Sequence, residues 1–214
     1  MIIAIDGPAA SGKGTLAKRI AAHYGYTHLD TGVLYRAVGR DVLKAGHSLD
    51  DASAAAKAAR SLDTSTLDDP ELRTETISDA ASRVAVIPEV RTALLQMQKD
   101  FPKGKPGVVV EGRDIGTAVF PDADAKLYIT ASLEERAHRR FRELAGEGEN
   151  LTYEAIYADL EARDSRDQTR TASPLRIADD AHLLDTTKLD IEAALLAAVR
   201  LIDAAMDRSK CALG

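Results

Sequence analysis

Apolar residues along the chain gather into short runs that are separated by longer stretches with helical spacing. The short runs are MIIAID (1–6), YTHLD (26–30), VVVEG (108–112), KLYIT (126–130) and HLLD (182–185). Short apolar runs of this kind are typical of buried strands in a parallel sheet. The pattern therefore predicts five strands.

Helical periodicity fills the segments between these runs. In 13–24, Leu16 and Ile20 lie four residues apart and share one face. Further helices are predicted over 31–44, through most of 48–106, and over 132–144, 152–168 and 190–207. Alternating strands and helices predict an α/β fold with a five-stranded parallel sheet flanked by helices on both faces. Ligands of such folds bind beyond the carboxyl ends of the strands.

Two helix starts carry capping signals. Asp69-Pro70-Glu71 offers an N-cap, a proline in the first turn and an acidic first turn. Ser132 and Glu135 have the spacing of a capping box.

Composition narrows the class of partner. The 214 residues carry a formal net charge of −6, which argues against nucleic acid or an anionic membrane as partners. Cys211 is the single cysteine, so no disulfide can form within the chain and a cytoplasmic location is expected. The initial run MIIAI is too short for a signal peptide or a membrane span.

The first candidate for chemistry is GPAASGKGT at 7–15. It follows a predicted strand and opens a predicted helix, which is the setting of a phosphate-binding P-loop. Its backbone N–H groups would converge on phosphate oxygens, and Lys13 would reach the outer phosphates. Glycine follows the lysine where many such loops carry Ser or Thr, so the hydroxyl comes one place later, at Thr15.

Arginines form the second candidate feature. Arg36 follows the second strand, Arg113 follows VVVEG, and two further groups comprise Arg136, Arg139 and Arg140, and Arg163, Asp167 and Arg170. A phosphate acceptor needs charge neutralisation but no general base, and arginine supplies this. Glutamates lie among the 136–142 group, so ion pairs on a solvated helix face explain it equally well. Arg36 and the 163–170 segment are also compatible with surface positions.

Taken together, five motifs resemble those of the bacterial cytidylate kinase (CMP/dCMP kinase) family. They are GPAASGKGT, LDTGVLYR, EGRDIGTAVFPDA, ERAHRR and RDSRDQTRTASPL, in this order. The resemblance covers nearly the whole chain. It implies a P-loop NTPase-type core with mobile NMP-binding and lid regions. It also implies ATP with Mg²⁺, transfer of the γ-phosphoryl group to CMP or dCMP, and a monomer.

The resemblance also assigns roles to residues. It implies ATP binding by Gly7, Pro8, Ala9, Ala10, Ser11, Gly12, Lys13, Gly14, Thr15 and Arg139, and catalysis by Lys13, Arg36, Arg113, Arg136, Arg140 and Arg170. CMP would be bound by Thr31, Arg36, Ser82, Arg91, Arg113, Asp114, Arg163, Asp167 and Arg170. Thr15 would face the metal, with Asp30 or Glu111 acting through water; the sequence does not choose between these two.

Base selectivity can be argued from chemistry. Asp114 would accept from the N4 amino group of cytosine, while Arg91 and Ser82 would donate to N3 and O2. Uracil presents an acceptor to that carboxylate, at a cost of about 1–3 kcal/mol. Ser82 is also compatible with simple helix packing.

The domain pattern departs from the family at one place. We expect one kinase domain, with a core of 1–31 and 107–214, an NMP-binding region of about 32–106 and a lid of about 138–152 that closes through GEGEN (146–150). The family's monophosphate-binding insert appears shortened to a loop near 61–73. This leaves the preference between CMP and UMP open.

Three alternatives remain. TKLD at 187–190 resembles a guanine-reading motif of GTP-binding switches, although no DxxG occurs in the chain. A sibling kinase would differ only in its choice of acceptor. A nucleic-acid binder that uses Arg136 to Arg142 conflicts with the acidic net charge.

Overall fold

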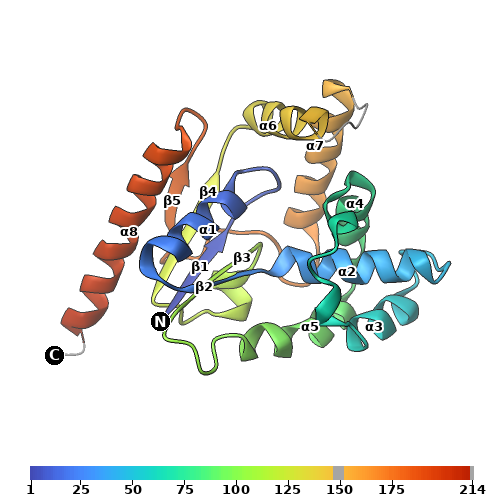
Figure 1. Cartoon of the computed structure of the whole chain (residues 1–214), viewed down its shortest axis with the longest axis horizontal. Helices are drawn as coiled ribbons and strands as arrows, with labels where there is room; N and C mark the ends of the chain where they lie inside the picture. Colours follow the sequence, from blue (N-terminus) through green and yellow to red (C-terminus); the bar gives the residue numbers. More distant parts are fainter. Residues whose placement is uncertain (147–151, 213–214) are drawn as a thin grey trace.

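The central feature of the structure, a computed structural model that describes residues 1–146 and 152–212, is one sheet (Figure 1). Its strands are β1 (Ile2–Asp6), β2 (Thr27–Asp30), β3 (Val108–Gly112), β4 (Ala125–Thr130) and β5 (His182–Asp185). Their order is β2-β3-β1-β4-β5, and every pairing is parallel. All five predicted strands are confirmed to within one residue at their ends.

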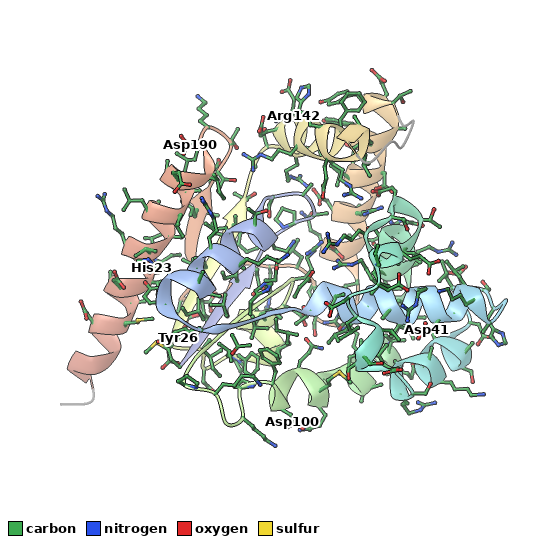
Figure 2. All side chains as sticks on the ribbon, in the orientation of Figure 1. His23, Tyr26, Asp41, Asp100, Arg142 and Asp190 are labelled. Carbon is green, nitrogen blue, oxygen red and sulfur yellow. The ribbon has the colours of Figure 1, made fainter. Side chains whose placement is uncertain are left out.

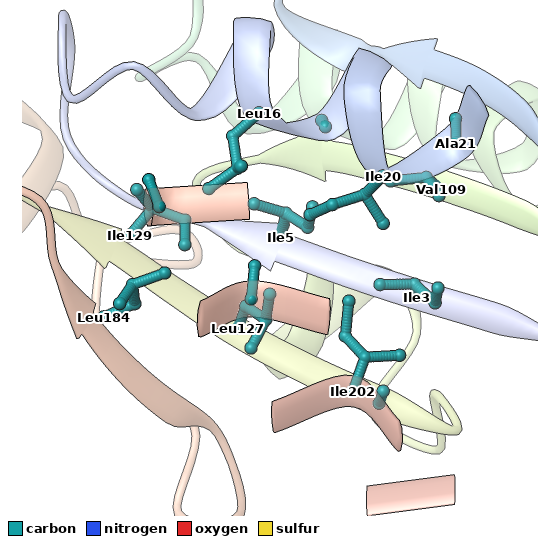
Figure 3. Packing of buried hydrophobic residues seen from close by; sticks show 14 residues of the cluster. Ile3, Ile5, Leu16, Ile20, Ala21, Val109, Leu127, Ile129, Leu184 and Ile202 are labelled. Carbon is teal, nitrogen blue, oxygen red and sulfur yellow. The ribbon is translucent and has the colours of Figure 1, made fainter. Parts of the chain in front are cut away.

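One face of the sheet is covered by α1 (Lys13–Tyr24) and α8 (Ile191–Ala212). Figure 3 shows Ile3, Ile5 and Ile129 of the strands packed against Leu16 of α1 and Ile202 of α8. These five side chains are at most 1% exposed. In β1, Ile3 and Ile5 point to this face and Ile2 and Ala4 to the other, because successive side chains of a strand alternate between faces.

The other face of the sheet packs against the segment that follows β3 and against α5 (Pro88–Asp100). Ala4, Val108 and Val110 form this second cluster with Ile115, and Leu95 of α5 packs against it. Burial on both faces explains why β3 reads as an apolar run without polar alternation.

A separate helical region lies between β2 and β3. It contains α2 (Thr31–Lys44), α3 (Ala52–Arg60), α4 (Glu75–Val84) and α5. Its helices share their own apolar core, which includes Leu34, Val38, Val84 and Leu94. The two most closely packed helices, α2 and α4, meet at Gly39, where a Cβ would come within 2.9 Å of the Ala80 Cβ.

Residues 61–73 form a loop with two short 3-10 turns, η1 (Thr64–Thr66) and η2 (Pro70–Arg73). Asp69 caps the second turn through the Glu71 N–H, but the α-helix expected here begins only at Glu75. The buried Arg40 guanidinium donates to the Thr66 hydroxyl at 2.9 Å and pairs with Asp69 at 3.2 Å. One arginine of α2 therefore anchors the loop.

Two helices, α6 (Leu133–Gly146) and α7 (Tyr153–Thr169), lie together beside the phosphate loop (Figure 1). Ala9 of the loop packs with Leu144 and Leu160. The predicted capping box is half formed: Ser132 Oγ accepts from the Glu135 N–H, but the Ser132 N–H donates to Thr187 Oγ1. Most of the predicted GEGEN hinge lies outside the described residues.

Across the described ranges, no helix has both the length and the apolar character that a membrane span requires.

Candidate active site

A cavity of about 350 Å³ lies beyond the carboxyl ends of β1, β2 and β3. The strand order places β1 between β3 and β4, so the loops after neighbouring strands separate there and leave a crevice. The cavity is lined by Ala9 to Thr15, Asp30, Thr31, Arg36, Ser82, Arg91, Glu111, Arg113, Asp114, Arg140, Arg163, Asp167 and Arg170, among others. The fold therefore brings together most of the residues predicted from sequence.

The phosphate loop turns through left-handed backbone conformations. Gly7, Ala10 and Gly12 have φ of 154°, 55° and 83°. At Gly7 a Cβ would overlap the Ile129 carbonyl oxygen of β4, so only glycine fits there. The turn ends at Gly12, α1 starts at Lys13, and the residues of its first turn up to Thr15 line the cavity.

Lys13 is the cation of this loop. Its Nζ donates to the Pro8 carbonyl oxygen at 3.2 Å. Burial, reinforced by the nearby Arg113, lowers the pKa of Lys13 from its usual 10.5 to about 8. A half-buried ammonium in this state gains from any anion placed beside it.

The structure gives a reason for the late hydroxyl. At Gly14 a Cβ would come within 3.3 Å of Glu111 Oε1, on the neighbouring strand β3. The Glu111 carboxylate is buried and lies 2.9 Å from His28 Nε2. A serine or threonine at position 14 would crowd this carboxylate, whereas Thr15 one residue later lines the cavity freely.

Four arginines form the far wall of the cavity: Arg91, Arg113, Arg163 and Arg170, here called the arginine wall. Arg113 follows β3 and donates to Asp167 Oδ2 at 2.9 Å. Arg170 lies at the C-cap of α7, one residue beyond the end of the helix. Each of these arginines forms a hydrogen bond or an ion pair with a residue from another part of the chain or from its own loop.

Arg170 is the most deeply buried member of the wall, with 2% of its side chain exposed. Its Nε donates to the Ser173 carbonyl at 2.7 Å, but Nη2 has no hydrogen-bond partner within the described residues. Burial and the neighbouring Arg91 lower the pKa of Arg170. An anion against Nη2 would satisfy this donor and offset the repulsion between the two guanidinium groups.

The base-reading candidates lie at one end of the cavity. Arg91 donates to Asp114, and its guanidinium carbon lies 5.7 Å from the centre of the Tyr35 ring. Ser82 lines the cavity, although its hydroxyl accepts from Arg166 Nε at 3.1 Å.

Asp114 precedes a single π-helical turn, η3 (Ile115–Val119), whose first N–H groups donate to the buried Asp6. Burial raises the pKa of Asp6 to about 6.

Near β2, Arg36 donates to Asp30 Oδ2 at 2.7 Å. Burial opposes ionisation of Asp30, but Arg36 and Lys13 outweigh it and hold the pKa of Asp30 below its usual range. Thr31 donates to the Glu111 carbonyl at 2.7 Å, so its hydroxyl joins β2 to β3 at the cavity edge.

Three arginines of α6 that were predicted as site residues lie in three different positions. Arg140 lines the first cavity and donates to Glu75 of α4. Arg139 lines a second cavity and donates to the carbonyl oxygens of Ser11 and Thr186. Arg136 is buried behind the phosphate loop, where it donates to the Ala9 carbonyl and pairs with Asp164 at 2.6 Å.

The position of Arg136 bears on the catalytic role expected for it. Among the described residues Arg136 is not part of the lining of either cavity. Its contacts support the loop from behind instead. The helical spacing alone could not reveal this, because the direction of α6 relative to the loop is a tertiary property.

The second cavity, of about 500 Å³, lies on the other side of the phosphate loop. Arg142 of α6 and Asp190 before α8 line two of its sides (Figure 2). Thr15 and Ser11 line both cavities, so the loop separates them. The TKLD segment (187–190) forms the turn that follows β5, where the Thr187 N–H donates to Asp185 at 2.8 Å.

Sequence reasoning missed several residues in or next to the site. Tyr35 lines the cavity, and Glu75 contacts two arginines of its lining, Arg140 and Arg163. Arg166 lies outside the lining and contacts Asp79 and Ser82. The sequence could have indicated Tyr35, because it adjoins Arg36 in the motif LDTGVLYR. Glu75 carried no signal beyond that of an acidic residue at a helix start.

Comparison with known proteins gives one consistent family. A family model described as cytidylate kinase matches residues 3–204. A cytidylate kinase of Methylocella silvestris is 56% identical over 207 residues, which is 97% of this chain and 96% of that protein. A cytidylate kinase of Brucella suis biovar 1 is 57% identical over 205 residues, covering 96% and 94%.

Solved structures agree on the fold. A gluconokinase from Sinorhizobium meliloti has a TM-score of 0.56 at 13% identity, covering 97% of this chain and 94% of that one. An uncharacterised protein from Eubacterium ventriosum has a TM-score of 0.55 at 14% identity, covering 95% and 98%. At such identities the likeness concerns the architecture alone.

Proposed function

This chain belongs to the cytidylate kinase family, and we propose that it transfers the γ-phosphoryl group of ATP to CMP and dCMP. The observation that carries the proposal is the first cavity, which has a phosphate loop on one side and the arginine wall on the other. Two polyanions fit such a space, one on each side.

On the donor side, the N–H groups of the phosphate loop hold the ATP phosphates, and Lys13 stabilises charge on the transferred group. The positive end of the α1 helix dipole also stabilises the negative charge of these phosphates. Arg139 and the second cavity receive the rest of the ATP molecule, on the opposite side of Ser11 and Thr15. Arg136 keeps the loop in place through the Ala9 carbonyl.

On the acceptor side, Arg36, Arg113 and Arg170 bind the CMP phosphate. An oxygen of this phosphate attacks the γ-phosphorus, the bond to the β,γ-bridging oxygen breaks, and ADP and CDP result. The attacking oxygen is already anionic, so no side chain needs to remove a proton. Arg140 from α6 reaches the same cavity and neutralises charge between the two nucleotides.

Recognition of cytosine falls to Asp114, Arg91 and Ser82, and the sugar lies near Thr31, Arg163 and Asp167. Asp114 is fixed on two sides, by Arg91 and by the turn that Asp6 caps. Its carboxylate then accepts from the cytosine amino group and repels the uracil carbonyl. The Arg40-anchored loop keeps α2 in place even though the insert is short.

The residues present fit a magnesium ion that is bound mainly by phosphates and water. In the described residues no group of three His, Cys, Asp or Glu side chains could hold a metal. Mg²⁺ in kinases commonly has only one or two protein ligands, and the Thr15 hydroxyl with Asp30 or Glu111 suits that mode. The ion would supply charge neutralisation on the phosphate oxygens.

We further propose a division into a core of 1–31 and 107–214, an NMP-binding region of about 32–106 and a lid of about 138–152. The separate apolar core of the helical region supports this division. We retain the expectation of a monomer that acts on nucleotides in the cytoplasm, without nucleic-acid or membrane partners.

The test is an assay of ADP formation with ATP and Mg²⁺ against CMP, dCMP, UMP, AMP and GMP. We expect CMP and dCMP to be the preferred acceptors. Tight GTP binding with slow hydrolysis and no acceptor requirement would instead identify a switch protein. Phosphorylation of an alcohol, or indifference to pyrimidine monophosphates, would overturn the proposal.

A further inference from the structure

One carboxylate connects three helices at the mouth of the first cavity. Glu75, the first residue of α4, accepts at Oε2 from Arg140 of α6, with distances of 2.9 Å from Nε and 2.6 Å from Nη2. Its other oxygen, Oε1, accepts from Arg163 of α7. The Glu75 side chain is 20% exposed, so these contacts are partly shielded from solvent.

The electrostatics favour the ionised form of this residue. Burial opposes ionisation, but Arg163 and Arg140 outweigh it and lower the pKa of Glu75. Both arginines have further acidic partners on their own helices: Glu143 lies 2.8 Å from Arg140, and Asp159 lies 2.6 Å from Arg163. Glu75 is the partner that crosses to another helix.

The two arginines have different roles under the proposed function: Arg140 neutralises charge between the two nucleotides, and Arg163 lies near the CMP sugar. Arg140 belongs to the α6 side, next to the phosphate loop, and Arg163 belongs to the arginine wall. In Figure 1, α4 stands beside α7, with the NMP-binding region on one side and the core on the other. Through these two ion pairs Glu75 connects α4, which carries Ser82 of the base site, to α6 and α7.

We propose that Glu75 is a positioning residue that couples ATP binding to CMP binding. Through its two arginines it links the position of α4 to that of α6, so that each nucleotide favours the arrangement that receives the other. This inference rests on the proposed function.

The same carboxylate also competes with substrate phosphates for these guanidinium groups. Its removal should therefore leave each nucleotide alone bound equally well or more tightly, while the coupling between them is lost. A merely structural role predicts the opposite, namely weaker binding of each nucleotide. The two roles can be separated by binding measurements.

The chain offers a matched control on the same helices. Asp79 of α4 pairs with Arg166 of α7 at 2.7 Å, but neither residue lines the cavity in the described structure. Asp79→Asn thus removes an ion pair between α4 and α7 without touching an arginine assigned to a nucleotide.

The experiment is calorimetric titration of CMP with and without a saturating non-hydrolysable ATP analogue. In the unaltered protein we expect the analogue to tighten CMP binding by about 5- to 150-fold. Glu75→Gln should reduce this factor to below about twofold, with affinities for the single nucleotides unchanged or higher. Asp79→Asn should keep the full factor by which the analogue tightens CMP binding.

Retention of the full factor in Glu75→Gln, or its absence from the unaltered protein, would overturn the proposal. Should Glu75→Gln fail to fold, Glu75→Ala carries the test, because it removes the carboxylate that contacts both arginines; a full factor in Glu75→Ala also overturns the proposal. Failure of CMP to bind at all would instead contradict the proposed function.

Discussion

The phosphate loop and the arginine wall face each other across one cavity and hold their cations in different ways. Lys13 donates to a backbone carbonyl, and no ion pair of Lys13 occurs among the described residues. Arg91, Arg113 and Arg163 are instead paired with carboxylates from other elements, namely Asp114, Asp167 and Glu75. One side presents a lone, half-buried charge, and the other presents charges that are already partly balanced.

The difference bears on what each side can do. A lone, half-buried ammonium has most to gain when negative charge develops beside it, which suits a role in the transition state. Paired guanidinium groups are held rigidly before the ligand arrives, which suits binding and orientation. Changes on the donor side should therefore reduce turnover, whereas changes on the acceptor side should reduce the affinity for CMP.

The largest expected effect comes from Lys13→Ala. We expect kcat to fall by about 10³-fold, since a positioned cation on the transferred phosphoryl group is removed. Circular dichroism should show an intact fold. Lys18→Ala, an exposed lysine on the same helix, serves as the control and should retain activity.

On the acceptor side, Arg170→Ala should raise KM for CMP by about 10- to 150-fold, the value of one lost hydrogen bond to a charged group. KM for ATP should change far less, and Arg36→Ala should behave in the same way. Steady-state kinetics with each nucleotide varied in turn gives the comparison. Equal effects on both nucleotides would contradict the division between the two sides. Arg176→Ala is a suitable exposed control.

Asp114→Asn tests base recognition within the acceptor side. The amide can donate to the uracil carbonyl, so the ratio of kcat/KM for CMP over UMP should shrink by about tenfold. Asp122→Asn, an exposed position in the same region, should leave the ratio unchanged. An unaltered ratio for Asp114→Asn would remove this residue from the base site.

The lowered pKa of Lys13 predicts a pH effect on the donor side alone. Lys13 is charged below its pKa of about 8 and becomes neutral as the pH rises through it. We expect kcat/KM for ATP to fall by about threefold between pH 7.5 and 8.5, since this parameter reports the free enzyme. The fall in kcat should come at higher pH, because the bound phosphates raise the pKa of Lys13. A flat kcat/KM profile over this range would contradict the assignment.

The smallest effect on catalysis is expected from Arg40→Ala, which releases the 61–73 loop. Losing the bonds to Thr66 and Asp69 should lower the free energy of unfolding by about 1–3 kcal/mol. KM for CMP should rise only a few-fold, and KM for ATP should not change. Urea denaturation measures the first effect, with the exposed Arg60→Ala as reference.

Much of this protein could be predicted from sequence because the relevant signals are local. The apolar runs gave all five strands, and the phosphate loop depends on adjacent residues and on a strand-to-helix junction. The helix expected at Asp69 was wrong because Asp69 caps a short 3-10 turn, and only Glu75, after the next break, starts α4. Capping chemistry marks a helical start without fixing the length of the helix.

Other features depend on which elements meet in space. The same spacing placed Arg136, Arg139 and Arg140 on one helix face, yet the packing of α6 sends them behind the loop, into the second cavity and into the first cavity. Glu75 joins arginines that lie 65 and 88 residues away in sequence. The chain by itself thus determined the strands, the loop and the charge of the cleft, because these follow from neighbouring residues. Only tertiary packing decided which carboxylate faces which arginine, because that pairing depends on contacts between distant segments.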